Sequence, residues 1–237
     1  MDSSFYTAAQ GARVRQKQMD IIANNIANIN TAGYREKDPV FRDLMYYQMR
    51  YTDNKEQKIP TGIGNVVQRT FDSQEQGNPY ETPSKTDFAI MGSGFFAVQD
   101  PKTKEVTYTR QGNFQVTDRG DGFYLVTSVG KLVLNEEGKP IKVNDKKELD
   151  SKVGVIDFPI TTGLMSVGDC EWKASEANGK PFVVKNAKVL ENYLEMSNVN
   201  LAREMSKVIE SSRAYAYNLK MVHTADEVEQ SINSLRS

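Results

Sequence analysis

The two ends of the chain carry apolar residues at helical spacing, and this feature limits the possible folds more than any other. Near the N-terminus, Phe5, Ala12, Met19 and Ile26 recur every seven residues. A second line follows each of them by three positions, through Ala8, Arg15, Ile22 and Ile29. Seven of these eight residues are apolar, the pattern of a heptad seam. The sequence therefore predicts a helix over residues 4–29, and Gly33 suits the left-handed conformation that often follows a helix.

The C-terminal segment repeats the pattern over a greater length. Residues 197–200, Ser-Asn-Val-Asn, are good helix caps. After them the apolar positions lie seven apart, with a companion line through Met205, Ser212 and Leu219, and the main line comprises Leu201, Val208, Tyr215 and Val222. After Val222 the stripe changes register, which is typical of a stammer in a coiled coil. We predict a helix over about 199–235.

Between the ends the sequence changes character twice. Residues 38–50 predict a second, short helix, with Asp38 as its cap and Pro39 as its first residue. Residues 51–85 are polar, contain scattered glycines and prolines, and predict an irregular, extended linker. Residues 86–188 hold short runs rich in β-branched and aromatic residues, separated by turn-forming residues. These runs predict a small antiparallel β domain, barrel-like or a sandwich.

The order helix, β domain, helix predicts an α+β fold. We expect the long N- and C-terminal helices to pack together as a coiled coil, with the small antiparallel β domain inserted between them. The predicted divisions are 1–50 and 189–237 for the two helical halves, 51–85 for the linker and 86–188 for the β-rich domain. Two helices cannot bury all of their apolar surface against each other, so the remainder is expected to meet other subunits.

Four stretches together resemble the bacterial flagellar basal-body rod and hook protein family, most closely its rod proteins. They are ANNIANINTAGY (23–34), GSGFFAV (92–98), YTRQGNFQV (108–116) and the long stretch at 193–227 that begins YLEMSNVNLARE. The resemblance covers essentially the whole chain, and it leaves open whether the subunit belongs to the proximal or the distal rod.

The resemblance implies a structural subunit rather than an enzyme. Members of the family are exported through the flagellar type III apparatus and polymerise through their terminal helices into a hollow, torque-transmitting tube. The implied partners are further copies of the chain, other rod and hook subunits, and the export apparatus. The implied location is the flagellar basal body in the cell envelope. The first twenty residues hold no apolar stretch of the kind found in secretory signals, so we expect export without a cleaved signal.

The resemblance also assigns roles to residues. The apolar stripes are expected to form subunit contacts, through Phe5, Ala12, Met19, Ile22, Ile26, Leu201, Met205, Val208, Tyr215, Leu219 and Val222. The asparagine-rich motif is expected to close the first helix and begin the turn after it, through Asn24, Asn25, Asn28, Asn30, Gly33 and Tyr34. Asparagine suits such a position because its amide bonds nearby backbone groups. In a packed tube, the amides of Asn24, Asn25 and Asn28 are also expected to bond across subunits.

Other kinds of site find little support. The chain has a single histidine, His223, and a single cysteine, Cys170, too few for a zinc site or a nucleophile with its base. Gly92 and Gly94 precede a predicted strand instead of a helix, so they predict a hairpin turn and not a phosphate loop. A net charge of -1 disfavours nucleic acid, and no apolar stretch is long enough to cross a membrane. We therefore expect no cofactor, metal or small-molecule substrate.

Two alternatives stay open. One is a hook-like subunit, or a secreted coiled-coil adapter or adhesin. The adapter or adhesin would form a discrete small oligomer instead of an open filament. The other is an enzyme with its active site in the β domain, for which the sequence offers no constellation of reactive residues.

Overall fold

The computed structural model describes residues 3–44, 46–50, 58–62, 64–120, 122–143, 150–184 and 187–236. The chain divides into two compact units. Unit 1 comprises Met1–Ala27, Lys37–Asp72 and Asn200–Ser237, and unit 2 comprises Asn28–Glu36 and Ser73–Val199. The chain therefore passes between the units four times, and neither unit is a single continuous segment.

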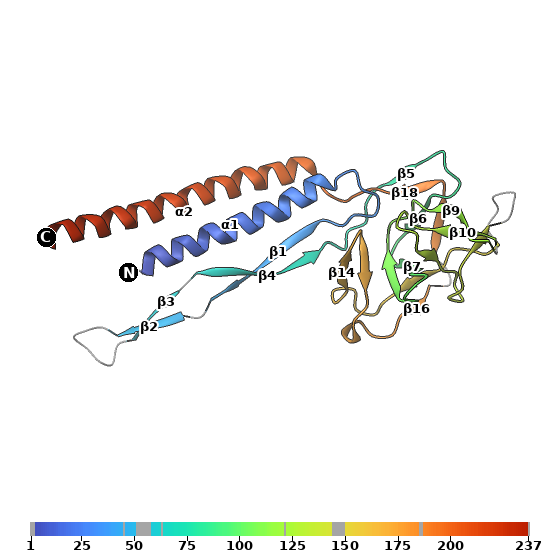
Figure 1. Ribbon diagram of the computed structural model, residues 1–237, viewed down its shortest axis with the longest axis horizontal. Helices are drawn as coiled ribbons and strands as arrows, with labels where there is room; N and C mark the ends of the chain where they lie inside the picture. The colour runs from blue at the N-terminus through green and yellow to red at the C-terminus, as the bar shows by residue number, and fades with distance from the viewer. Residues whose placement is uncertain are drawn as a thin grey trace. The chain divides into compact units, whose positions relative to one another are not determined.

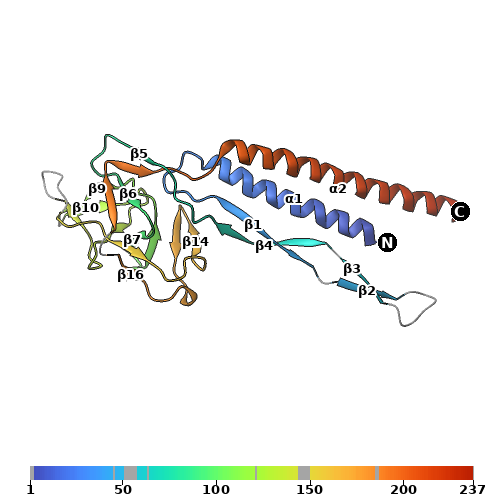
Figure 2. The same ribbon diagram turned by 180° about the vertical axis from the view of Figure 1, so that it is seen from behind.

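Unit 1 consists of two long helices and a two-stranded ribbon. Helices α1 (Ser3–Ala27) and α2 (Leu201–Arg236) lie side by side, and α1 also packs on the ribbon strands β1 (Lys37–Asp43) and β4 (Asn65–Asp72) (Figure 1). Seen from behind, α1 again lies between α2 and the ribbon (Figure 2). Among the described residues of unit 1, helix α1 is thus packed on two sides, whereas α2 packs mainly on α1.

Both terminal helices agree with the periodicity of the sequence. The predicted segments 4–29 and 199–235 correspond to Ser3–Ala27 and Leu201–Arg236. Asn200 caps α2, because its side-chain Oδ1 accepts a hydrogen bond from the Arg203 backbone N–H at 3.2 Å. Gly33 has φ +69°, the left-handed conformation expected there. The α+β class is confirmed, and coiled-coil packing of the helices stays a prediction.

The predicted helix over residues 38–50 is wrong. Its described residues form β1 and, after Leu44, strand β2 (Tyr46–Arg50), while residue 45 lies outside the described residues. Strand β1 pairs with β4 in antiparallel register from Lys37↔Asp72 to Asp43↔Asn65. The helix-like Asp-Pro start was misleading because proline is also tolerated in an edge strand, and both strands of a two-stranded ribbon are edges. A partner almost thirty residues away decides the structure, and local propensity does not show it.

The predicted irregular linker over residues 51–85 is also wrong for the residues that the structure describes. Residues 51–57 and 63 lie outside the described residues. The described part holds β3 (Lys58–Gly62), which pairs with β2, the strand β4, and β5 (Pro79–Glu81), which pairs with β18 (Tyr193–Glu195). Strand β4 carries Val66, Val67 and Thr70, whose β-branched side chains favour extended backbone. The polar composition of the segment agrees with β4 and β5, whose residues are exposed or half-buried.

Unit 2 is built from short antiparallel strands. Besides β5 and β18 they are β6 (Phe88–Met91), β7 (Phe95–Gln99), β8 (Val106–Thr109), β9 (Gln115–Asp118), β10 (Phe123–Val126), β11 (Leu132–Val133), β12 (Lys142–Val143), β13 (Val155–Asp157), β14 (Met165–Gly168), β15 (Glu171–Lys173), β16 (Phe182–Val183) and β17 (Lys188–Glu191), with a 3-10 turn η1 (Glu176–Asn178). The largest sheet has the order β12-β10-β11-β7-β8-β15-β14, β13 also pairs with β7, and β17 pairs with β6. The predicted antiparallel β domain is confirmed, whereas its description as a barrel or sandwich stays a prediction.

Strand β7 separates two apolar cores. Phe96 and Val98 point into a cluster with Phe88 and Leu125, while the alternate residues Phe95 and Ala97 point into a second cluster that contains Tyr108, Phe158 and Trp172. Because successive side chains of a strand point to opposite faces, a strand buried on both sides reads as a continuous apolar run. The run FFAV is that signal.

The predicted hairpin at Gly92 and Gly94 is wrong. Both glycines have positive φ, +102° and +112°, and they do form a turn into a strand. However, β6 before the turn pairs with β17, whereas β7 after it pairs with β8, β11 and β13. The turn therefore moves the chain from one sheet to another.

Candidate assembly site

The asparagine-rich motif joins the end of α1 to the ribbon by a side-chain contact. Asn25 is completely buried, and its amide pairs with the backbone of Lys37 in both directions. Asn25 Nδ2 donates to the Lys37 carbonyl at 2.9 Å, and the Lys37 N–H donates to Asn25 Oδ1 at 3.0 Å. The side chain thus imitates a strand backbone, which no apolar residue could do. These contacts lie two residues before the last residue of α1, and the role of the motif in closing the helix stays a prediction.

The buried Asn25 amide also connects α1 to α2. Its Nδ2 donates to Glu204 Oε2 at 2.9 Å, and Glu204 is itself fully buried. The other carboxylate oxygen of Glu204 pairs with Lys207 Nζ at 2.7 Å, and Lys207 also pairs with Asp38 of β1 at 3.1 Å. A charge at this depth is tolerated because it is both paired and hydrogen-bonded. We call Asn25, Lys37, Asp38, Glu204 and Lys207 the unit 1 cluster.

The remaining asparagines lie in the turn or on the surface. Asn28 accepts hydrogen bonds from the Thr31 N–H through its carbonyl and from the Thr31 hydroxyl through its side chain, both at 3.1 Å. Asn24 and Asn30 are exposed. Asn25 and Asn28 therefore both shape the chain at the end of α1.

The turn then brings a short buried segment into unit 2. Gly33 donates its N–H to the Glu195 carbonyl at 2.7 Å, and a Cβ on Gly33 would lie 2.6 Å from the Arg110 backbone. A side chain larger than hydrogen cannot be placed there without moving the backbone. Tyr34 and Arg35, which follow, are buried. Gly33 and Tyr34 thus act inside one subunit.

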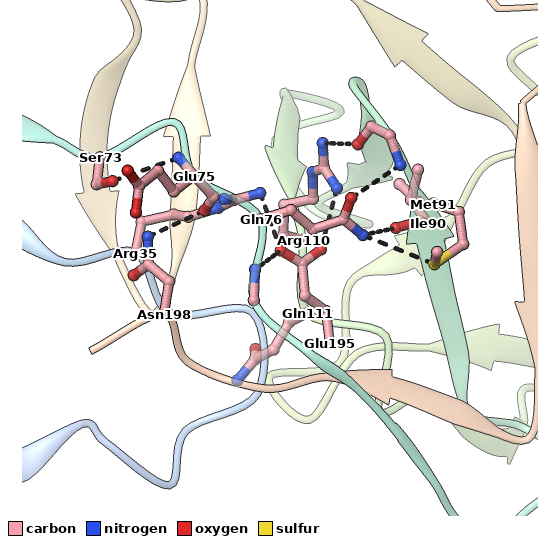
Figure 3. A network of polar contacts seen from close by, with 12 residues as sticks. Arg35, Ser73, Glu75, Gln76, Ile90, Met91, Arg110, Gln111, Glu195 and Asn198 are labelled. Carbon is pink, nitrogen blue, oxygen red and sulfur yellow. Dashed lines mark hydrogen bonds and ion pairs between the residues drawn. The ribbon is translucent and has the colours of Figure 1, made fainter. Parts of the chain in front are cut away.

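Two buried arginines share one carboxylate in this part of unit 2 (Figure 3). Arg35 Nη2 lies 2.9 Å from Glu195 Oε1, and Arg110 Nη1 lies 3.0 Å from Glu195 Oε2. The Gly77 N–H donates to Oε1 at 3.1 Å, and Arg110 Nη2 donates to the Gly92 carbonyl at 2.7 Å. Each of the three charged side chains is less than a tenth exposed. We call Arg35, Gly77, Arg110 and Glu195 the unit 2 cluster.

The unit 2 cluster holds two buried positive charges for one buried negative charge. Burial lowers the pKa of Arg35 from its ordinary value, the Glu195 carboxylate opposes this effect, and repulsion from Arg110 adds to it. Two guanidinium groups around one carboxylate leave a net positive charge in a site with little water. The single carboxylate is therefore the group on which the cluster depends.

The contact between the helices fixes their antiparallel register. Asn25 lies against Glu204, and Gly11 lies so close to Asn218 that a Cβ on Gly11 would be 3.1 Å from its amide. The less exposed residues of α2 repeat at alternating intervals of four and three, through Glu204, Val208, Ser211, Tyr215, Asn218, Val222, Ala225 and Glu229. This is heptad spacing, and half of its members are polar.

The predicted apolar stripe divides between two faces of α2. Val208, Tyr215 and Val222 lie on the inner line, whereas Leu201, Met205 and Leu219 are exposed. The second inner line, beside Val208, is polar and consists of Glu204, Ser211 and Asn218. Hydrophobicity alone did not reveal it. On α1, Ala12 and Ile22 are buried, and Phe5, Met19 and Ile26 are half-buried within unit 1. The surface still open for assembly therefore lies mainly on α2.

The sequence did not point to the charged clusters. Glu195, Arg35, Arg110 and Glu204 looked like ordinary surface residues among many charges. A weak signal was available, because Glu204 takes an inner heptad position and Arg35 directly follows the glycine-tyrosine turn. Charged residues at such positions are buried only when they are paired.

Reactive chemistry is not supported by the described residues. Among them no group of three or more histidine, cysteine, aspartate or glutamate residues could hold a metal ion. His223 is exposed, and Cys170, the single cysteine of the sequence, is half-buried. A search of the described helices found none with the length and apolar character needed to span a membrane.

Comparison with known proteins gives a consistent result along the whole chain. Three family models match: "Flagella basal body rod protein" over residues 5–35, "Flagellar hook protein FlgE/F/G D1 domain" over 89–162, and "Flagellar basal body rod FlgEFG protein C-terminal" over 190–235. The flagellar basal-body rod protein FlgG of Buchnera aphidicola subsp. Baizongia pistaciae is 31% identical over 271 residues, which cover 99% of this chain and 100% of the relative. FlgG of Caulobacter vibrioides is 31% identical and covers 98% of both chains. The flagellar hook-basal body complex protein FlhP of Bacillus subtilis is 28% identical over 98% of this chain and 99% of its own.

Proposed function

The chain belongs to the flagellar basal-body rod protein family, and from this membership we propose that it polymerises through its terminal helices into a hollow tube that transmits torque. The family is structural, and its members' names place them in the basal body. The chain is accordingly a structural subunit of the flagellar rod, which confirms the resemblance found in its sequence. Polymerisation, the type III export route and a final position in the cell envelope are parts of the proposal.

One observation supports polymerisation most strongly. Within the described part of unit 1, helix α2 packs mainly on α1. Its open surface holds nine exposed large apolar residues: Leu201, Met205, Ile209, Tyr217, Leu219, Met221, Val228, Ile232 and Leu235. An apolar surface of this extent is unusual on a monomeric protein and favours contact with another protein. A rod or hook subunit is the partner that family membership supports, and it includes further copies of this chain.

A chromosomal replacement tests the proposal. The gene is replaced by one that encodes the chain truncated after residue 198, which removes α2, or by the full chain with Leu219→Asp. Isolated basal bodies are then imaged by electron microscopy, and swimming is measured. We expect non-motile cells with incomplete rods from both variants.

The matched control is Lys220→Asp, which places the same charge one residue away without removing an apolar side chain. It is expected to support rods of normal length. Intact rods and normal swimming after the truncation would contradict the proposal and favour the adapter alternative. The charge in Leu219→Asp lies on the exposed side, so a folded monomer with an unchanged helical circular dichroism spectrum is expected.

A further inference from the structure

A cavity of about 310 Å³ in unit 2 lies against the unit 2 cluster. Arg35 and Arg110 form part of its wall, together with the turn at 92–94 and with Phe95, the first residue of β7. The residues that line the cavity all belong to unit 2, so the cavity lies within one compact unit. Its volume is at the lower end of the range found for small-molecule sites.

Hydrogen bonds hold the wall of the cavity beside Arg110 (Figure 3). The Gly92 N–H donates to Gln76 Oε1 at 3.0 Å, and Gln76 Nε2 donates to the Ile90 carbonyl at 2.7 Å. The Gly92 carbonyl accepts from Arg110 Nη2 at 2.7 Å, and the Arg110 guanidinium also lies 5.4 Å from the centre of the Phe95 ring. This side of the cavity is therefore preformed, which reduces the cost of ordering a site when a ligand binds.

The two arginines have hydrogen-bonding capacity and charge that the cluster does not use. Arg35 Nη1 and Arg110 Nε are buried and have no hydrogen-bond partner among the described residues, although buried donors are nearly always paired. Glu195 supplies one negative charge for both guanidinium groups. Burial lowers the pKa of Arg35, so a second negative charge nearby would stabilise its charged form. The cluster is thus short of one negative charge, and the cavity that both arginines line has room for one.

A carboxylate on another part of the wall limits the choice of ligand. Asp157 lines the cavity and is only 9% exposed. Its Oδ1 accepts a hydrogen bond from the Phe158 N–H at 2.8 Å, and among the described residues neither arginine of the cluster forms an ion pair with Asp157. Asp157 would repel a second negative group on the ligand. It would attract a hydrogen-bond donor, most strongly a cationic one.

We propose that this cavity binds a small free carboxylate that carries a hydrogen-bond donor at its other end, as amino and hydroxy acids do. The carboxylate lies against Arg35 and Arg110, and the donor lies against Asp157. A carboxylate suits guanidinium groups because its two oxygens match their fork of N–H donors. Binding needs no second copy of the chain, so the site is independent of the proposed polymer.

Calorimetric titration of the full-length chain with matched four-carbon ligands tests the site. The ligand γ-aminobutyrate carries both groups, butyrate lacks the donor, and butylamine lacks the carboxylate. We expect γ-aminobutyrate to bind at one site per chain, about tenfold more tightly than butyrate, because it adds a charge-assisted hydrogen bond. Butylamine should show no saturable binding in the same concentration range. Equal binding of butylamine and γ-aminobutyrate, or no saturable binding of γ-aminobutyrate, would overturn the proposal.

A variant of Asp157 tests the donor end of the site. Asp157→Asn keeps an oxygen that can accept from the Phe158 N–H but removes the negative charge. It is expected to weaken γ-aminobutyrate about tenfold and to change butyrate by less than about twofold. An unchanged preference for γ-aminobutyrate in this variant would contradict the placement of the donor.

A variant of Ser93 tests the carboxylate end without removing a member of the unit 2 cluster. Ser93 is exposed and lies on the wall of the cavity, so Ser93→Glu supplies a tethered carboxylate. It is expected to weaken γ-aminobutyrate and butyrate by at least about tenfold and to raise the urea midpoint of Trp172 fluorescence. The matched control Ser128→Glu changes an exposed serine outside the wall and should leave both affinities unchanged. Equal affinities in the two variants would show that the ligand binds elsewhere.

Discussion

Replacing Glu195 by glutamine should destabilise unit 2 strongly while changing almost no volume. The substitution removes the single negative charge that Arg35 and Arg110 share at 2.9 and 3.0 Å, and it leaves both guanidinium groups buried. Loss of one partner from a buried ion pair costs about 3–5 kcal/mol of the free energy of unfolding. Glutamine can still accept the Gly77 hydrogen bond, so the loss reports on charge and not on backbone contacts.

The assay uses the only tryptophan of the chain. Trp172 is buried in the second core of unit 2, beside Phe95, and the Arg110 guanidinium lies 5.4 Å from the centre of the Phe95 ring. Urea unfolding followed by Trp172 fluorescence therefore reports on unit 2. With a denaturant slope of about 2 kcal/mol/M, the expected loss moves the midpoint down by about 1.5–2.5 M.

Two further variants make this reasoning refutable. Glu191→Gln removes an exposed carboxylate from β17 and is expected to change stability by less than about 0.5 kcal/mol. Glu195→Gln combined with Arg35→Met removes a guanidinium together with the carboxylate, so it should lose about 1–3 kcal/mol less than the sum of the two single changes. A loss below about 1 kcal/mol for Glu195→Gln, or additive losses in the double variant, would show that the arginines do not depend on this carboxylate.

Three other changes test separate features of the structure. Asn25→Ala should cost about 1–3 kcal/mol of unit 1 stability, measured by circular dichroism at 222 nm, because it leaves buried backbone groups unpaired, whereas Asn30→Ala on the surface should cost little. Gly77→Ala should lower the free energy of unfolding in urea by about 3 kcal/mol or more, because its Cβ would lie 1.8 Å from a backbone carbonyl oxygen. The control Gly120→Ala, at φ +88° with open space around it, should lower it by only about 1 kcal/mol. Ser211→Ala should raise the thermal midpoint of the helical signal, since it removes a buried hydroxyl without a partner among the described residues and adds about 0.5 kcal/mol of helix propensity. A destabilised Ser211→Ala variant would mean that the hydroxyl is hydrogen-bonded in solution.

The sequence was most informative where one period extended over many residues. The heptads at both ends located α1 and α2 to within two residues, and the run FFAV marked a strand buried on both faces. The ribbon was not predicted, because Val40 and Phe41 are extended by pairing with strand β4, and such a partner leaves no local pattern.

The charged clusters could not be predicted for a related reason. Burial of Glu195 depends on two arginines that are 160 and 85 positions away in the chain, and composition does not reveal such neighbours. Likewise, the companion line of α2 was placed one residue from its true position, because its members Glu204, Ser211 and Asn218 are polar. Their burial depends on what faces them, such as Asn25 and the small surface of Gly11.

The interrupted course of the chain has a consequence for the order in which the protein folds. Closing unit 1 around an unstructured segment of Ser73–Val199 would carry a loop entropy cost of about 4 kcal/mol. Inside unit 2, however, strand β5 pairs with β18, and the Met196 N–H donates to the Asn78 carbonyl at 3.0 Å. Once these contacts form, the beginning and end of the segment are held near each other, and most of that cost has already been met. Pairing of α1 with α2 should therefore be the late kinetic step, and variants that slow the folding of unit 2 should delay the helices equally.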